Sequence, residues 1–117
     1  MTSEQADAQD RIFSALADEN RRLLLINLAE NSPKTATQLA KDFNTTLEKD
    51  ISRQGLLKHL NILSDAGLVT VQPHGREKRY FLTPEPLHTV SAWIDLLGAR
   101  WDARLQRLKT LLEDDTI

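Results

Sequence analysis

Residues 52–67, SRQGLLKHLNILSDAG, decide the fold of this chain. Three leucines in this stretch recur at intervals of four and three residues, so they fall on one face of a helix and predict a core stripe. They are Leu56, Leu60 and Leu63. The opposite face is polar and carries Gln54, Lys58 and Asn61. Either Asp50 or Ser52 is placed to cap the start of this helix, and Gly67 takes the position that follows its end.

Three further helices are predicted before this one. The first covers about residues 3–17, with apolar residues at helical spacing toward its end. Asp18 is a good N-cap for a second helix, which ends before Asn31. Thr35 and Gln38 have the spacing of a capping box, in which each side chain satisfies a free backbone N–H at the start of a third helix.

After Gly67 the hydrophobic period changes from 3.6 to 2. Residues 68–72 and 78–82 are rich in Val, Thr, Tyr and Phe and are separated by Pro73, His74, Gly75 and Arg76, which predicts a β-hairpin with a basic tip. A long last helix is expected from residue 86 to residue 113. Its apolar positions follow one another at steps of three or four. They are Val90, Ile94, Leu97, Trp101, Leu105, Leu108 and Leu112.

This order of elements predicts a mainly α fold with a small β-hairpin, a winged helix-turn-helix with a long C-terminal dimerisation helix. We expect residues 1–117 to form a single domain. Its parts are a first helix at about 1–17, a helix-turn-helix at 35–66, a wing at 68–82 and the dimerisation helix at about 86–113; the family resemblance described below implies that the helix at 1–17 also takes part in dimerisation. A helix fits the major groove of B-DNA, and its positive N-terminus approaches phosphate.

The residues expected to contact DNA lie on the helix at 52–61 and on the wing. They are Ser52, Arg53, Gln54, Leu57, Lys58, His59, His74, Arg76 and Lys78. Arg53 suits guanine, Gln54 suits adenine, and Leu57 suits a thymine methyl group. Lys58 or His59 is expected to reach phosphate. For His59 a half-buried ring bonded to nearby backbone is an equal alternative.

The charge distribution agrees with this interpretation. The chain has a net charge of −2, so the whole molecule does not attract polyanions. Residues 49–79, however, contain six Lys and Arg against three Asp and Glu, a local balance of +3. The first ten and the last five residues each carry −3, so we expect both ends to face away from DNA.

Composition excludes several other classes. The chain has 117 residues, 40% of them hydrophobic, and no cysteine, which excludes disulfides, thiolate metal sites and cysteine nucleophiles. The start is acidic and polar, unlike a signal peptide, so we expect the cytoplasm. No nucleophile elbow, phosphate loop or HExxH motif is present, and we expect no enzyme activity. No cofactor is expected.

Between about Arg11 and Thr83 the sequence resembles the ArsR type of bacterial winged-helix repressor. The resemblance rests on LADENRRLLLINLAEN, TATQLAKDF, ISRQGLLKHLNILSDAGLV and VQPHGREKRYFLT. It implies a homodimer, formed by the first and last helices, that binds a two-fold related operator and represses transcription. The tail WDARLQRLKTLL is similar to a subgroup often encoded beside small-ligand-binding proteins of the SRPBCC fold. Against the family pattern, the turn at residues 44–50 is long.

The expected dimer interface has its own apolar residues. They are Phe13, Val90, Trp93, Ile94, Leu97, Trp101, Leu105 and Leu108. The two tryptophans suit a dimer core or, less readily, the wall of a ligand pocket. Thr35 and Thr37 stand where metal-sensing relatives carry cysteines, and the last helix has only His88, so we expect no metal site. The effector is unknown, no membrane contact is expected, and the alternative function is a protein-interaction module without operator binding.

Overall fold

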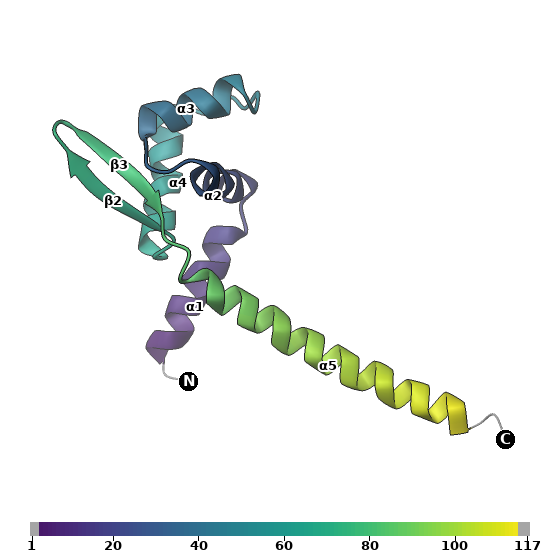
Figure 1. Cartoon of the computed structure of the whole chain (residues 1–117). Coiled ribbons are helices and arrows are strands. Elements are labelled where there is room, and N and C mark those ends of the chain that lie inside the picture. The colour runs from purple at the N-terminus through teal and green to yellow at the C-terminus, as the bar shows by residue number, and fades with distance from the viewer. Residues whose placement is uncertain (1–2, 115–117) are drawn as a thin grey trace. The chain divides into compact units, whose positions relative to one another are not determined.

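The computed structural model describes residues 3–114, which form two compact units that divide between Leu87 and His88. We describe the two units separately. The N-terminal unit contains four helices and a small sheet, and the C-terminal unit is one helix, α5 (Figure 1). The helices are α1 (Ser3–Leu16), α2 (Glu19–Glu30), α3 (Ala36–Thr45), α4 (Arg53–Asp65) and α5 (Leu87–Asp114). The strands are β1 (Lys34–Thr35), β2 (Val69–His74) and β3 (Glu77–Leu82).

The helices begin where the sequence places capping side chains. Asp18 Oδ1 accepts from the Arg21 N–H at 3.1 Å at the start of α2. At the start of α3, Thr35 and Gln38 form the predicted capping box, with distances of 3.2 and 2.9 Å. Of the two candidates for α4, the cap is Ser52. Each cap satisfies a backbone donor that has no partner inside its helix, which fixes where the helix starts.

One hydrophobic core holds the N-terminal unit together. The three leucines of the quoted stretch are fully buried, as predicted, and lie against side chains from α1, α2, α3 and the sheet. The fully buried side chains are Leu24, Leu28, Leu39, Phe43, Leu56, Leu60, Leu63 and Leu68. Because all of α4's core leucines project inward, its polar residues must project away from the core.

The sheet has three antiparallel strands in the order β1-β3-β2, one more than the predicted hairpin. β1 is only two residues long and pairs Lys34 with Tyr80 and Thr35 with Arg79. The hairpin strands are also longer and their turn is shorter than predicted, because His74 pairs with Glu77 and leaves only Gly75 and Arg76 between the strands. Pro73 is tolerated within β2 because β2 is an edge strand and needs no second partner there.

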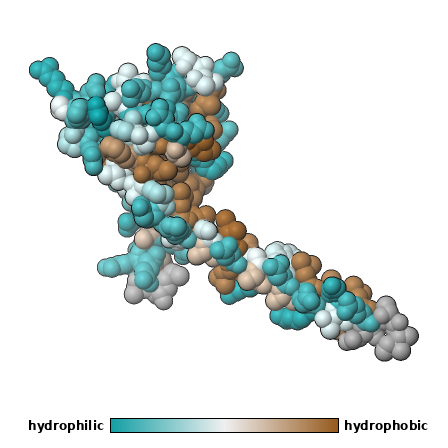
Figure 2. All heavy atoms as spheres, viewed as in Figure 1, coloured by the Kyte–Doolittle hydropathy of each residue, from teal (hydrophilic) through white to brown (hydrophobic). Residues whose placement is uncertain are grey.

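Helix α5 covers the predicted last helix, shifted by one residue at each end. Its large apolar side chains are about half exposed, from 46% for Leu97 to 63% for Leu111. Figure 2 shows this apolar surface along α5, interrupted by charged groups. Such a surface marks an association site. No helix within residues 3–114 combines the length and the apolar character that a membrane span requires.

Candidate nucleic-acid interface

The polar face of α4 lies open to solvent. Gln54, Lys58 and Asn61 are all exposed on the side of the helix away from the core. Leu57 lies at the flank of this face, half-buried against core residues. Within residues 3–87 no other part of the N-terminal unit covers the polar face. Helix α4 therefore presents amide and ammonium groups in the pattern that a helix needs to contact base edges and phosphates in a groove.

Arg53 occupies the first position of α4, an unusual place for a cation. The N-terminus of a helix is its positive end, and a positive side chain there is unfavourable by roughly 0.3–1 kcal/mol. The side chain is exposed, and its Nη1 donates a 3.0 Å hydrogen bond to Thr37 Oγ1 in the first turn of α3. This bond holds the guanidinium between the N-termini of two helices. Departures from local preference of this kind are expected at functional positions.

Ser52 has a structural task beside its predicted DNA contact. Its Oγ accepts from the Gly55 N–H at 3.0 Å and so caps α4. A Cβ on Gly55 would lie 3.2 Å from this oxygen, closer than ordinary van der Waals contact, so glycine leaves the cap undisturbed. Glycine destabilises a helix by about 1 kcal/mol relative to alanine, and the space that Gly55 leaves for the capping oxygen offsets part of this cost.

The long turn before α4 is held by Asn44. Its amide nitrogen donates to the Ile51 carbonyl at 3.2 Å, and its amide oxygen accepts from the Ile51 N–H at 3.0 Å. Within the turn Glu48 has a φ of 52°, the left-handed region that non-glycine residues seldom adopt. The extra residues therefore form an ordered connection, and Asn44 fixes the point at which α4 begins.

The wing is a tight hairpin with an exposed tip, and Figure 1 shows it extending away from α2 and α3 of the same unit. Gly75 has a φ of 64° at the first of the two central turn positions, as a type II′ turn requires. His74, Arg76 and Lys78 are exposed on this hairpin. Glu77 lies among them and lowers the positive charge of the tip.

A hollow of about 480 Å³ joins these parts. It brings together the start of α3, the polar flank of α4 and the base of the wing. Its lining residues are Thr35, Ala36, Thr37, Arg53, Leu57, Asn61, Arg76, Glu77, Lys78 and Tyr80. At its floor burial raises the pKa of Tyr80, although the charge of Arg53 partly opposes this, so the phenol stays neutral at pH 7. Of the predicted DNA contacts, the hollow gathers Arg53, Leu57, Arg76 and Lys78.

The structure also places residues at this surface that the sequence-based list omitted. Thr37 lies in the first turn of α3 and holds Arg53, and Asn61 and Tyr80 line the hollow. The capping box at Thr35 was a usable signal, since it fixes the start of α3, and helix N-termini attract phosphate. Nothing local in the sequence indicated Tyr80, because its position depends on the pairing of β1 with β3.

His59 is half-buried and engaged inside the fold. Its Nδ1 lies 3.2 Å from Nη1 of Arg21, whose remaining nitrogens donate to the carbonyls of Ala15 and Ser14. Burial raises the pKa of nearby Asp18, but the Arg21 N–H and the charges of His59 and Arg21 together lower it below its usual value. The ring's partner is thus a side chain and not the nearby backbone. This contact links α4 to α2 and directs His59 away from the polar face.

The fold and this surface define a DNA-binding transcriptional regulator of the winged helix-turn-helix class. The profile of the helix-turn-helix domain family matches residues 16–72. The homodimeric winged helix-turn-helix DNA-binding domain of Mb0332 from Mycobacterium bovis shares the fold, with a TM-score of 0.62 at 20% identity over 85% of this chain and 88% of that one.

Two proteins with a higher sequence identity to this chain identify its family. The HTH-type transcriptional regulator YuzN of Bacillus subtilis is 39% identical over 88 residues, which are 74% of this chain and 96% of YuzN. An ArsR-like transcriptional regulator from Rhodococcus sp. RHA1 is 33% identical with a TM-score of 0.75, covering 97% of this chain and 98% of that one. The chain belongs to the ArsR-like family of helix-turn-helix transcriptional regulators, as the sequence resemblance implied.

Proposed function

We propose that the protein is a homodimeric repressor that binds a two-fold related operator through α4 and the wing. The observation that carries the proposal is the exposed polar face of α4, which begins with Arg53 beside the start of α3 and continues into the basic wing. In this arrangement Arg53 and Gln54 contact bases. Lys58, Arg76 and Lys78 contact phosphate, and His74 lies at the wing tip near the neighbouring groove.

In this proposal two residues have roles that differ from the DNA contacts predicted for them from the sequence. Ser52 contributes mainly by capping α4, which sets the position of Arg53. His59 contributes by joining α4 to Arg21 and makes no DNA contact. Leu57 is half-buried at the edge of the hollow, where its exposed part is available to a thymine methyl group.

The homodimer is supported by the apolar surface of α5 and by the homodimeric state of Mb0332. We assign its interface to α5 and to Phe13 of α1, with the dimerisation, helix-turn-helix and wing segments at the boundaries predicted from the sequence. A regulator of this family acts at the chromosome, so we place the protein in the cytoplasm and assign it no enzymatic activity. Similarity of the α5 tail to the SRPBCC-associated subgroup remains part of this proposal.

The proposal is tested by comparing two arginine variants on specific and random DNA. Arg53→Ala is expected to weaken operator binding by about 1–3 kcal/mol and to relax sequence preference, because it removes a base contact. Arg76→Ala is expected to weaken binding to all sequences alike and to reduce the slope of log affinity against log salt by about one. Fluorescence anisotropy at several salt concentrations measures both.

The DNA upstream of the protein's own gene is the first probe. Sequence-specific retention at about 0.15 M salt supports the repressor. An equal loss for Arg53→Ala on specific and random DNA would remove the base contact assigned to it. Retention of neither DNA at any protein concentration would leave the interaction module as the better explanation.

A further inference from the structure

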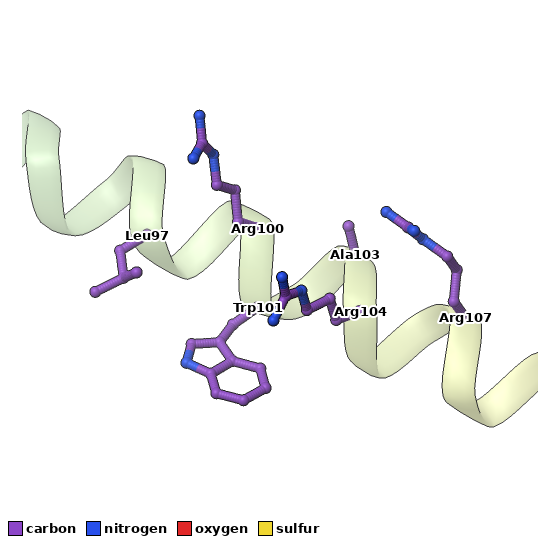
Figure 3. A pocket seen from close by; sticks show the side chains of 6 residues that line it. All are labelled: Leu97, Arg100, Trp101, Ala103, Arg104 and Arg107. Atoms are coloured by element: carbon purple, nitrogen blue, oxygen red, sulfur yellow. The ribbon is translucent and has the colours of Figure 1, made fainter.

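Arg53 is exposed, yet its guanidinium is held by a side chain of another helix. Its Nη1 donates a 3.0 Å hydrogen bond to Oγ1 of Thr37, 16 residues earlier in the chain. By contrast, Figure 3 shows Arg100 and Arg107 of α5 extending outward from their own helix. An arginine side chain has many rotamers, and fixing one of them is entropically unfavourable. The bond to Thr37 must therefore be weighed against this cost.

The contact between Arg53 and Thr37 adds little to the stability of the fold. Both side chains are exposed, so water competes for the same donor and the same acceptor. The guanidinium also lies at the positive ends of α3 and α4, where a cation is unfavourable. Holding Arg53 in this place opposes two local preferences, and such conflicts are typical of functional positions.

A second observation places the guanidinium over the hollow between α3, α4 and the wing. Arg53 and Thr37 both line this hollow, whose volume is about 480 Å³. At its floor burial raises the pKa of Tyr80, and the positive charge of Arg53 opposes this effect. Arg53 is thus close enough to act on the phenol, so the bond to Thr37 directs the guanidinium over the hollow.

The atom that Thr37 holds decides which edge of the guanidinium is left for another partner. A guanidinium carries five N–H donors in one rigid plane. With Nη1 bound to Thr37, Nε and Nη2 form an edge that presents two N–H groups side by side. Guanine offers two acceptors, O6 and N7, that match such an edge in the major groove, whereas adenine offers one acceptor and one donor there.

We propose that Thr37 is a positioning residue that sets the base preference of Arg53. Its hydroxyl holds Nη1 and so presents the Nε–Nη2 edge of Arg53 to a guanine in the major groove. Because the side chain is fixed before DNA binds, less conformational entropy is lost when the base contact forms. The inference rests on the proposed operator binding and adds the residue that makes Arg53 selective.

Without the Thr37 hydroxyl, other acceptors compete for the guanidinium. Glu77 of the wing lines the same hollow, and DNA phosphates are charged acceptors as well. An Arg53 side chain bound to either of them no longer discriminates between bases. Loss of the hydroxyl is therefore expected to change selectivity more than affinity.

Selection from a library of randomised DNA duplexes tests the proposal without knowledge of the operator. The full chain and its variants bind the same library, and sequencing of the bound DNA gives the base preference at every position. Thr37→Val has nearly the shape and the helix propensity of threonine but lacks the hydroxyl. At the position where Arg53→Ala abolishes a guanine preference, we expect Thr37→Val to lower it about three- to tenfold and to leave other positions unchanged.

Thr37→Ser is the matched control, because it keeps the hydroxyl that holds Nη1 and should retain the guanine preference. Arg53→Lys keeps the charge without the two-donor edge, so it should lose this preference and keep the slope of log affinity against log salt. In the Arg53→Ala background, Thr37→Val should cause no further loss of preference. Urea denaturation checks the fold of each variant, and Thr37→Ala, which also lacks the hydroxyl, is measured beside Thr37→Val.

The possible results separate this inference from the proposed function. If Arg53→Ala removes a guanine preference that Thr37→Val and Thr37→Ala retain in full, Arg53 contacts the base without Thr37, and the inference alone is rejected. An equal loss of affinity for all sequences in the Thr37 variants, with unchanged base preference, also rejects it. A library from which the natural protein selects no sequence rejects the proposed operator binding, and the inference with it.

Discussion

The start of α4 carries a neutral capping side chain, Ser52, next to the cation Arg53. A substitution of Ser52 can therefore change DNA binding while it leaves the stability of the helix unchanged. Aspartate caps a helix as well as serine does, and its charge suits the positive end of the helix. Ser52→Asp should therefore leave the free energy of unfolding within about 0.5 kcal/mol of the natural protein. The same charge would face phosphate in the proposed complex, so we expect at least a tenfold loss of DNA affinity.

The matched control is Ser52→Asn, which retains the capping oxygen without a charge and should bind DNA like the natural protein. Urea denaturation and fluorescence anisotropy measure the two properties separately. If Ser52→Asp bound DNA with unchanged affinity, the start of α4 would not face the phosphate backbone.

Asp42 connects α3 to β1 and α2 through its side chain. The Lys34 ammonium lies 2.7 Å from Asp42 Oδ2, and this hydrogen bond, with a further one from Asn27, holds the pKa of Asp42 below its usual value. A carboxylate with a lowered pKa stabilises the fold above the pKa of the unfolded chain, about 3.9, and this contribution is lost as the pH falls through the folded pKa.

Asp42→Asn should accordingly lower the free energy of unfolding by about 1 kcal/mol at pH 7, and by progressively less as the pH approaches 3. Urea denaturation between pH 3 and pH 7 measures this difference. Asp65→Asn, at an exposed carboxylate of α4, serves as the control and should show little change at either pH. A deficit for Asp42→Asn that stayed constant with pH would assign the effect to packing and not to the charge.

At the scale of elements, the turn between α3 and α4 depends on one side chain. Removing both hydrogen bonds in Asn44→Ala should destabilise the fold by about 1–2 kcal/mol and weaken specific DNA binding, because α4 loses its fixed start. Asn44→Asp retains the acceptor for the Ile51 N–H but loses the donor, so its effect should be intermediate. Thermal unfolding and operator titration check this order, and equal effects of the two substitutions would show that only the donor matters.

The sequence predicted the features of this fold that depend on neighbours along the chain. The caps at Asp18 and Thr35, the two candidate caps of α4 at Asp50 and Ser52, and the buried face of α4 all follow from residue types and their spacing over three or four positions. β1 was not predicted, because two residues carry no period and their strand exists only through pairing with β3. For the same reason the contact between Arg21 and His59, 38 residues apart, had no local signal.

Within the candidate site the same distinction holds. The polar face of α4 could be predicted from helical spacing, and the exposed wing tip from its glycine and basic residues. The hollow that joins Arg53 to the wing depends on how the sheet places Tyr80 and Lys78 beside α4. Such packing depends on residues distant in the chain. Residue spacing alone therefore predicted the site residues of α4 and the wing, but it did not assign Thr37 and Tyr80 to the site.

In the proposed function the N-terminal unit contacts DNA and α5 forms the dimer, and each of these two functions depends on the other. The N-terminal unit carries the polar and basic surface, while α5 carries the apolar face to which we assign the dimer interface. A dimer joins two DNA-binding surfaces, so the second contact on a two-fold operator becomes intramolecular and the apparent affinity rises. Loss of α5 pairing should therefore weaken operator binding without any change in the DNA-contacting residues.

Trp101→Glu tests this dependence, because it places a charge at the centre of the apolar face, where burial of an unpaired carboxylate is strongly unfavourable. We expect the variant to sediment as a monomer at concentrations where the natural protein is a dimer, and to lose at least tenfold in operator affinity. Ala99→Glu adds the same charge on the outer face of α5 and should remain a dimer. A stable Trp101→Glu dimer would show that association uses another surface, whereas a monomer with full operator affinity would show that the two functions are independent.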